Sequence, residues 1–149
     1  MRDGRARTAR GNLETLIERF PGDTLAEPTT YDVARLALEA RDFEAARMRL
    51  DRLIAIGRDP ALAEPARFLR CRVDAERAGP AAAEPCCAAF RRDFPASPHD
   101  AEVLALLASA ALARGDCHAG APLLDEYLRR YPQGPFAEAA KKGSGRCGR

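Results

Sequence analysis

Residues 110–132 read AALARGDCHAGAPLLDEYLRRYP, and this stretch decides the fold class. Apolar residues recur three and four positions apart on both sides of Gly115-Asp116, which is the spacing of a helix face and not of a strand. Glycine commonly ends a helix and aspartate commonly caps the start of one. Pro132 then closes the second segment. The stretch therefore predicts two helices joined by a tight turn.

The pattern returns along the chain with a period of 37 residues. The segment Leu25-Ala26-Glu27-Pro28 recurs as Leu62-Ala63-Glu64-Pro65, and Phe136-Ala137-Glu138 follows two periods later. We call residues one period apart a column. Two columns are large or apolar and two are small, as closely packed helices require: Leu16, Leu53, Phe90, Tyr127; Leu13, Leu50, Cys87, Leu124; Ala34, Cys71, Ala108; and Ala46, Ala83, Gly120.

The period predicts an all-α fold, a right-handed α-solenoid of helix-turn-helix repeats with the first helices inside. We expect a disordered basic N-terminus over 1–11, a repeat domain over 12–140 and a disordered tail over 141–149.

Pro85 and Pro122 share a column and are expected to delay the start of their helices, because proline donates no backbone hydrogen bond. The helices are expected at 12–20, 28–40, 43–56, 61–77, 81–93, 98–114 and 117–131, with a stub from 136. The predicted continuous core is Leu50, Leu53, Phe90, Leu124 and Tyr127.

The hairpin of residues 110–132 resembles a tetratricopeptide repeat, with a small residue in the first helix, a Gly-Asp turn and a closing proline. The segment Arg41-Asp42-Phe43-Glu44-Ala45-Ala46 keeps this turn, whereas Ala78-Gly79-Pro80 is degenerate. The endings Phe94-Pro95-Ala96-Ser97-Pro98 and Tyr131-Pro132-Gln133-Gly134-Pro135 are similar to a bacterial subgroup that includes outer-membrane assembly lipoproteins and Tol-Pal coordination proteins. The resemblance covers about residues 12 to 140 and implies a protein-binding groove on the first helices.

Charge and composition argue against several function classes. Of the net charge of +2, residues 1–10 hold +3 and residues 141–149 hold +4, so the body carries −5. Nucleic-acid binding normally needs a basic face on the folded part. No apolar run reaches the roughly 20 residues that span a bilayer, and no secretory signal follows the first residues. We expect a cytoplasmic location for the chain as given, or a periplasmic or cell-envelope one if it is a fragment.

The cysteines and histidines give no strong chemical signal. The five cysteines form an odd set without a CxxC pair, which disfavours zinc and fits a reducing compartment. Core packing is the preferred interpretation of Cys86 and Cys87, with a Cys71–Cys87 disulfide left open. Neighbouring helical side chains point about 100° apart, so Cys117 and His118 do not form a nucleophile-base pair. His99 is likewise interpreted as a solvated turn residue.

One stripe on the first helices is the candidate binding site. Tyr31, Arg35 and Glu39 lie four residues apart and therefore share a helix face. One period later the stripe repeats as Phe68, Arg72 and Glu76. An aromatic ring beside an arginine can hold an extended peptide by stacking and by a forked hydrogen bond. The alternative is a pair of solvated intrahelical ion pairs over a half-buried ring.

Two functions are left open. The first is a non-catalytic scaffold that binds an extended peptide or partner protein on the groove of its first helices. The second is a C-terminal helical-repeat appendage or fragment of a larger cell-envelope or regulatory protein. We expect no enzyme activity, because no metal set, phosphate loop or triad spacing is present. No cofactor, nucleic acid or small-molecule substrate is expected, and membrane association would come only through a partner or a missing segment.

Overall fold

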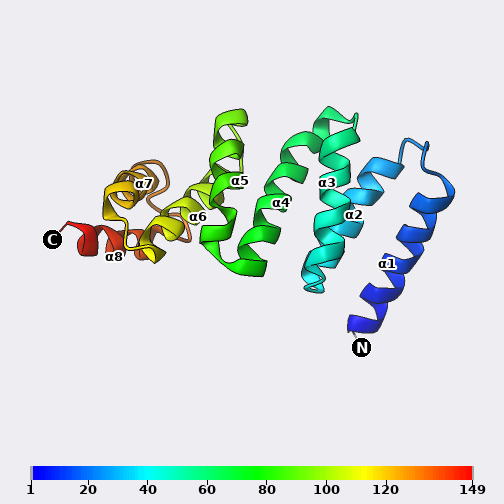
Figure 1. Ribbon diagram of the computed structural model, residues 1–149, viewed down its shortest axis with the longest axis horizontal. Coiled ribbons are helices and arrows are strands. Elements are labelled where there is room, and N and C mark those ends of the chain that lie inside the picture. The colour runs from blue at the N-terminus through cyan, green and yellow to red at the C-terminus, as the bar shows by residue number, and fades with distance from the viewer. Residues whose placement is uncertain (1, 149) are drawn as a thin grey trace. The chain divides into compact units, whose positions relative to one another are not determined.

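The computed structural model describes residues 2–148, with side chains described for 4–148, and every regular element in that range is a helix (Figure 1). The predicted all-α class is therefore confirmed. The elements are α1 (Arg2–Arg19), α2 (Ala26–Glu39), α3 (Phe43–Ile56), η1 (Pro60–Leu62), α4 (Ala63–Ala78), α5 (Pro80–Asp93), α6 (Asp100–Ala113), α7 (Cys117–Arg130) and α8 (Ala137–Cys147).

Helix starts and ends follow the local capping chemistry that the sequence predicts. The Asp42 carboxylate accepts the backbone N–H of Ala45 at the start of α3, and Asp116 accepts that of Ala119 at the start of α7. The residue before each aspartate takes a left-handed conformation, Arg41 with φ 59° and Gly115 with φ 70°. Each turn therefore stops one helix and caps the next within two residues.

The chain forms two compact units, and unit 1 spans residues 1–73. In it α1 packs on α2 and α2 packs on α3. The predicted core residues Leu50 and Leu53 are buried here, and the small residues Ala34 and Ala46 let the helices approach closely. The buried cluster of this unit is Ala34, Ala37, Leu38, Ala46, Leu50, Leu53, Ala66, Leu69 and Val73.

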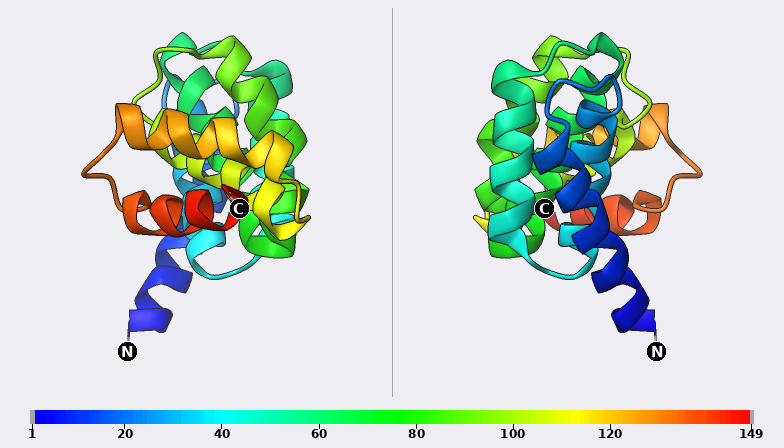
Figure 2. Two further views of the ribbon diagram at one scale, coloured as in Figure 1. Left: turned by 90° about the vertical axis from the view of Figure 1, so that its left-hand side faces the viewer. Right: turned by 90° about the vertical axis from the view of Figure 1, so that its right-hand side faces the viewer.

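Leu16 departs from its column. It is 41% exposed, whereas Leu53, one period later, is 7% exposed. Leu16 lines a small cavity with Ala26 and Thr29 of α2 instead of a closed core, and α1 lies at the edge of its unit, nearest the viewer in Figure 2 (right). The same residue type is thus a core residue on α3 and a surface residue on α1.

Unit 2 spans residues 74–149 and is built around α6, which packs on α5 and α7, while α7 packs on α8. Figure 2 (left) shows α7 and α8 side by side. The predicted core residues Phe90, Leu124 and Tyr127 are each at most 1% exposed. Leu124 and Tyr127 belong to a cluster with Leu104, Ala108, Ala137 and Ala140.

Both chain ends are helical where the sequence analysis expects disorder. Helix α1 begins at Arg2, and Arg10 ties it to the start of α3 through Asp42 at 2.8 Å, with Glu14 of α1 itself at 3.0 Å. Helix α8 runs on to Cys147, and its Gly143 sits so close to α6 and α7 that a Cβ there would lie 3.0 Å from a Leu112 methyl group. Tertiary contacts at Arg10 and Gly143 support these two helices, although residues 4–9 of α1 are exposed.

The expected delay at the two helix prolines is wrong. Helix α5 begins at Pro80 and continues through Pro85, and α7 begins at Cys117 and continues through Pro122. Each proline is the sixth helical residue, so only one backbone hydrogen bond is forfeited near the start. Burial of Cys87 and Leu124 just beyond these prolines favours the helix over an unwound turn.

Candidate functional site

The first copy of the predicted stripe lies on α2 with its polar groups in solvent. Arg35 is about half-exposed, donates to Glu39 across 2.7 Å, and has Asp32 at 3.9 Å. Tyr31 is half-buried and packs on the core cluster of unit 1. The guanidinium group is therefore paired with exposed carboxylates of its own helix, while the core keeps the Tyr31 ring in place.

The second copy differs because its ring is inside the molecule. Phe68 on α4 is only 5% exposed and cannot stack on a partner, although it shares a column with Tyr31. Arg72 is partly exposed and Glu76 is exposed on the same helix. Glu76 belongs to unit 2, so the part of the stripe within unit 1 is Tyr31, Arg35, Glu39 and Arg72.

The charges of Arg35 and Arg72 both affect the pKa of the Tyr31 hydroxyl. Burial raises its pKa, while the positive charges of Arg35 and Arg72 act in the opposite direction and Asp32 and Glu64 add to the rise. Tyr31 therefore stays protonated at neutral pH and keeps an O–H donor within the electrostatic influence of two guanidinium groups. Such a set can bind a carboxylate or a main-chain carbonyl.

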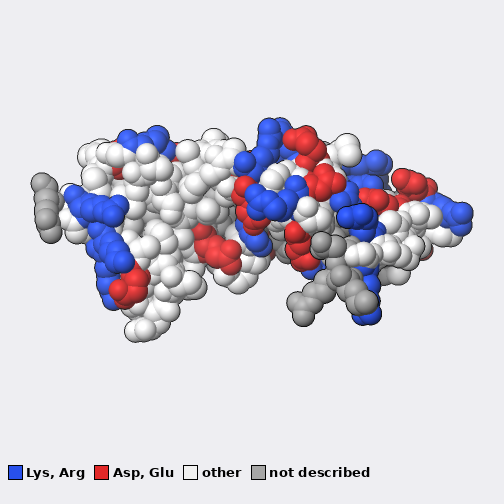
Figure 3. Space-filling view, turned by 90° about the horizontal axis from the view of Figure 1, so that it is seen from below, with Lys and Arg blue, Asp and Glu red and all other residues white. Residues whose placement is uncertain are grey.

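A second set in unit 1 was not predicted. A cavity of about 440 Å³ opens between α1, the α1–α2 connection, α2 and the end of α3. Its lining includes Ile17, Leu53 and Ile56, and three arginines, Arg49, Arg52 and Arg58. On the face shown in Figure 3, the side chains of unit 1 alternate between basic and acidic, whereas that face of unit 2 is mostly uncharged.

Sequence analysis misses this cavity because its residues come from four separate segments. The only local signal is that Arg49, Arg52 and Ile56 lie three and four residues apart and so share one face of a helix. Their meeting with Ile17 depends on how α1 packs, which the repeat columns do not encode.

In unit 2 the most connected polar group is a buried carboxylate. Asp100 is 2% exposed, and its two oxygens meet Arg91 Nε at 2.8 Å, Arg130 Nη1 at 2.7 Å and the Tyr131 hydroxyl at 2.8 Å. Arg91 also holds Glu126 at 2.5 Å. The Arg91 hydrogen bond keeps the pKa of Glu126 below its usual range. Because every charge in this network is paired, we assign it to holding α5, α6 and α7 together and not to chemistry.

The core-packing interpretation is confirmed for Cys87 but is wrong for Cys86, which is half-buried and disulfide-bonded. Cys87 is a free, fully buried thiol, and burial raises its pKa to about 12. The left-open Cys71–Cys87 disulfide is therefore absent, and so is a Cys86–Cys87 bond. A thiol with this pKa carries almost no thiolate at neutral pH, so Cys87 is not a nucleophile.

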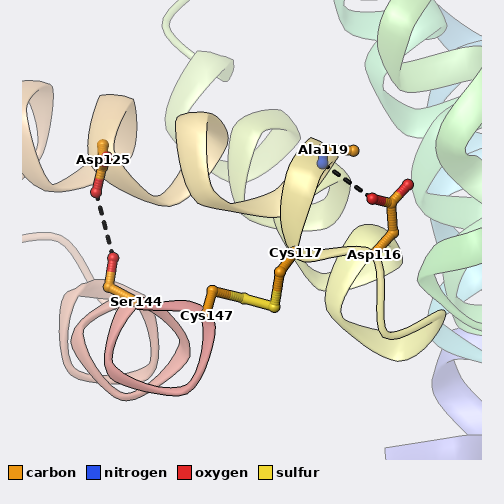
Figure 4. The surroundings of a disulfide bond; sticks show 6 residues. All are labelled: Asp116, Cys117, Ala119, Asp125, Ser144 and Cys147. Atoms are coloured by element: carbon orange, nitrogen blue, oxygen red, sulfur yellow. Dashed lines mark hydrogen bonds between the residues drawn. A yellow bond between two sulfur atoms is a disulfide. The ribbon is translucent and has the colours of Figure 1, made fainter. Parts of the chain in front are cut away.

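Cys117 has a role that the sequence analysis did not assign. It forms a disulfide with Cys147, with the two Cα atoms 5.2 Å apart (Figure 4). The bond fastens the end of α8 to the start of α7, and the Ser144 hydroxyl donates to Asp125 at 3.3 Å further along the same pair of helices. The odd number of cysteines, taken in the sequence analysis as a sign of a reducing compartment, therefore did not predict this disulfide. His118, next to the bond, is exposed.

Loss of this disulfide is expected to destabilise unit 2. Closing a loop over a sequence separation of 30 residues restricts the unfolded chain, and such bonds typically contribute about 2 to 4 kcal/mol. Cys117→Ser should lower the free energy of urea unfolding by that amount, and hydrogen exchange should rise first in α8. In reducing buffer, which also breaks the disulfide bonding of Cys71 and Cys86 in both proteins, the parent and the variant should have equal stability. Equal stability of the oxidised parent and the variant would contradict this role.

Comparison with known proteins assigns no class to this chain. No family model matches it, and no curated protein matches it. Among the described residues, no helix is long and apolar enough to cross a bilayer, and no three His, Cys, Asp or Glu side chains cluster as metal ligands would. The tetratricopeptide resemblance therefore stays a prediction from the repeat pattern.

Proposed function

We propose that this protein is a non-catalytic interaction scaffold of tetratricopeptide type, in which repeats stack as an α-solenoid. Its ligand is an extended segment of a partner protein. The binding surface in unit 1 is the first-helix surface, which we define as Tyr31, Arg35, Glu39 and Arg72. Phe68 is buried and therefore does not touch the ligand.

The observation that carries this proposal is the arrangement around Tyr31. Arg35 is exposed and its partner Glu39 is 60% exposed, so a ligand carboxylate can replace Glu39 at little cost. The half-buried ring packs on the core, so its hydroxyl donor is held in place, and the charges of Arg35 and Arg72 both act on it. Held donors lose little conformational entropy when a ligand binds, which favours recognition by main-chain and carboxylate contacts.

The test is a double substitution of both arginines by lysine. Lysine keeps the charge but loses the planar fork that binds a carboxylate through two hydrogen bonds. A partner is first identified by pull-down and mass spectrometry, and its binding segment is then titrated by calorimetry. Arg35→Lys with Arg72→Lys should weaken binding by about tenfold or more, because hydrogen bonds to charged groups contribute roughly 1.5 to 3 kcal/mol each.

The matched control is Arg47→Lys on α3, an arginine of similar exposure that lies 3.6 Å from Asp51. It should bind as the parent does, and all variants should keep the parent's thermal midpoint. If the double variant binds the segment with the parent's affinity, the stripe is a solvated helix face and the partner binds elsewhere.

One observation favours the alternative function, a helical-repeat part of a larger cell-envelope protein. Disulfides persist in oxidising compartments such as the bacterial periplasm and are rare in the cytosol. The Cys117–Cys147 bond therefore supports export. Thiol labelling and mass spectrometry of protein recovered from its native host decides the point, since blocked Cys117 and Cys147 support export and two labelled thiols contradict it.

A further inference from the structure

The cavity at the end of unit 1 carries an imbalance of charge. Arg52 and Arg58 are exposed, and neither side chain makes an ion pair with a described residue. Arg49 is 21% exposed and approaches Glu14 only to 4.0 Å. Arg52 and Arg58 therefore line the opening without an ion-pair partner, and Arg49 has only a long one.

The two carboxylates in the lining are already engaged by the backbone. Glu27 accepts the N–H groups of Arg58 and Asp59, each at 2.8 Å, and these bonds lower its pKa. Asp23 accepts the N–H of Leu25 at 2.8 Å. These bonds hold the two loops that border the cavity, and neither carboxylate forms a hydrogen bond with an arginine side chain of the lining. The carboxylates of Asp23 and Glu27 thus stabilise the loops around the cavity, while the side chains of Arg52 and Arg58 can pair with a ligand.

The opening is also apolar. Ile56 at its edge is 64% exposed, Ile17 is half-buried and Leu53 is buried. A smaller neighbouring cavity of about 60 Å³ is also lined by Ile17. The exposed side chains of Phe20 and Leu25 line this smaller cavity as well. Large exposed apolar side chains beside unpaired charges mark a surface that binds a partner with the complementary pattern.

We propose that this cavity, the arginine cavity, binds an acidic peptide segment with interspersed apolar side chains. Ligand carboxylates pair with Arg52 and Arg58, and ligand apolar side chains rest on Ile17 and Ile56. An extended segment that alternates the two residue kinds presents acidic groups on one side and apolar groups on the other. A simple anion would leave the apolar lining in water, and a polyanion would meet Asp23 and Glu27.

This site shares no residue with the first-helix surface, so it stands whether or not that surface binds a partner. It gives unit 1 a second place for a ligand, at the packing of α1 against the hairpin of α2 and α3.

The experiment uses the full chain and a short fluorescein-labelled peptide of alternating Glu and Leu, titrated by fluorescence anisotropy. Two comparison peptides replace either Glu by Gln or Leu by Ser. Both should bind with an affinity at least about tenfold lower, because the Gln peptide loses the charge interactions and the Ser peptide loses the apolar contacts. Arg52→Gln with Arg58→Gln should weaken binding of the parent peptide to a similar degree, and Ile56→Ser severalfold.

Matched controls lie on the same helix. Arg47→Gln and Ile54→Ser change exposed residues of α3 outside the cavity and should leave binding unchanged. Amide spectra of ¹⁵N-labelled protein should show the largest peptide-induced shifts at Gly22 and Gly57, which line the cavity, and not at Tyr31 or Arg35.

Four outcomes overturn the assignment. Equal binding of the Gln peptide excludes charge recognition, and full displacement by inorganic phosphate reduces the site to anion binding. Shifts confined to Tyr31 and Arg35 place the peptide on the first-helix surface. A concentration-dependent dimer in sedimentation that Ile56→Ser abolishes assigns the cavity to a second copy of the chain.

Discussion

Phe90→Ala is expected to lower the free energy of unfolding by about 3 to 5 kcal/mol, the usual cost of emptying an aromatic core site. Phe90 is fully buried in α5, and its ring centroid lies 5.1 Å from that of Phe94. The neighbouring helices cannot close over the vacated volume without moving their own buried side chains. Both the lost transfer free energy and the residual cavity therefore contribute.

Urea unfolding followed by circular dichroism measures this loss. Phe20→Ala is the matched control, because Phe20 is 55% exposed and its removal should change stability by about 0.5 kcal/mol or less. An unchanged urea midpoint for Phe90→Ala would contradict the buried position of its ring.

Asp100→Ala is expected to have an effect of similar size, about 3 to 5 kcal/mol. The substitution leaves the Tyr131 hydroxyl without its buried acceptor and leaves Arg91 and Arg130 to share Glu126 alone. Removing one partner of a buried ion-pair network is strongly destabilising because the remaining charges have already lost water and now lose part of their compensation. Asp100→Asn should cost less, since the amide oxygen still accepts one of these hydrogen bonds.

Thermal and urea unfolding of the two variants give the comparison. The control is Asp125→Ala, which removes an exposed aspartate with one 3.3 Å bond to Ser144 and should cost about 0.5 kcal/mol or less. If Asp100→Ala is no less stable than Asp125→Ala, the buried network does not hold α5, α6 and α7 together.

Helix positions could be predicted well because local chemistry sets them. The predicted range 43–56 coincides with α3, and the turns at Asp42 and Asp116 have the expected caps. Burial of Leu50, Phe90 and Tyr127 also followed from apolar residues at helical spacing. These features depend on residues within a few positions of one another, which a sequence displays directly.

The columns were less reliable for surface residues. Tyr31 and Phe68 share a column, yet one is half-buried on the surface and the other is in the interior. Leu16 and Leu53 share another, and only Leu53 is covered. A column fixes where a residue sits on its own helix, but burial depends on what packs against that face.

The sequence by itself determined the all-α class, the capped turns and the core side chains, because each depends on backbone propensity and on spacing along one helix. Only the tertiary structure decided the Cys117–Cys147 bond, the Asp100 network and the arginine cavity. Each joins groups from separate helices or turns, some of them 30 or more residues apart, as Cys147 and Tyr131 are from Cys117 and Asp100. Their meeting depends on packing distances between helices, which no pattern along the chain encodes.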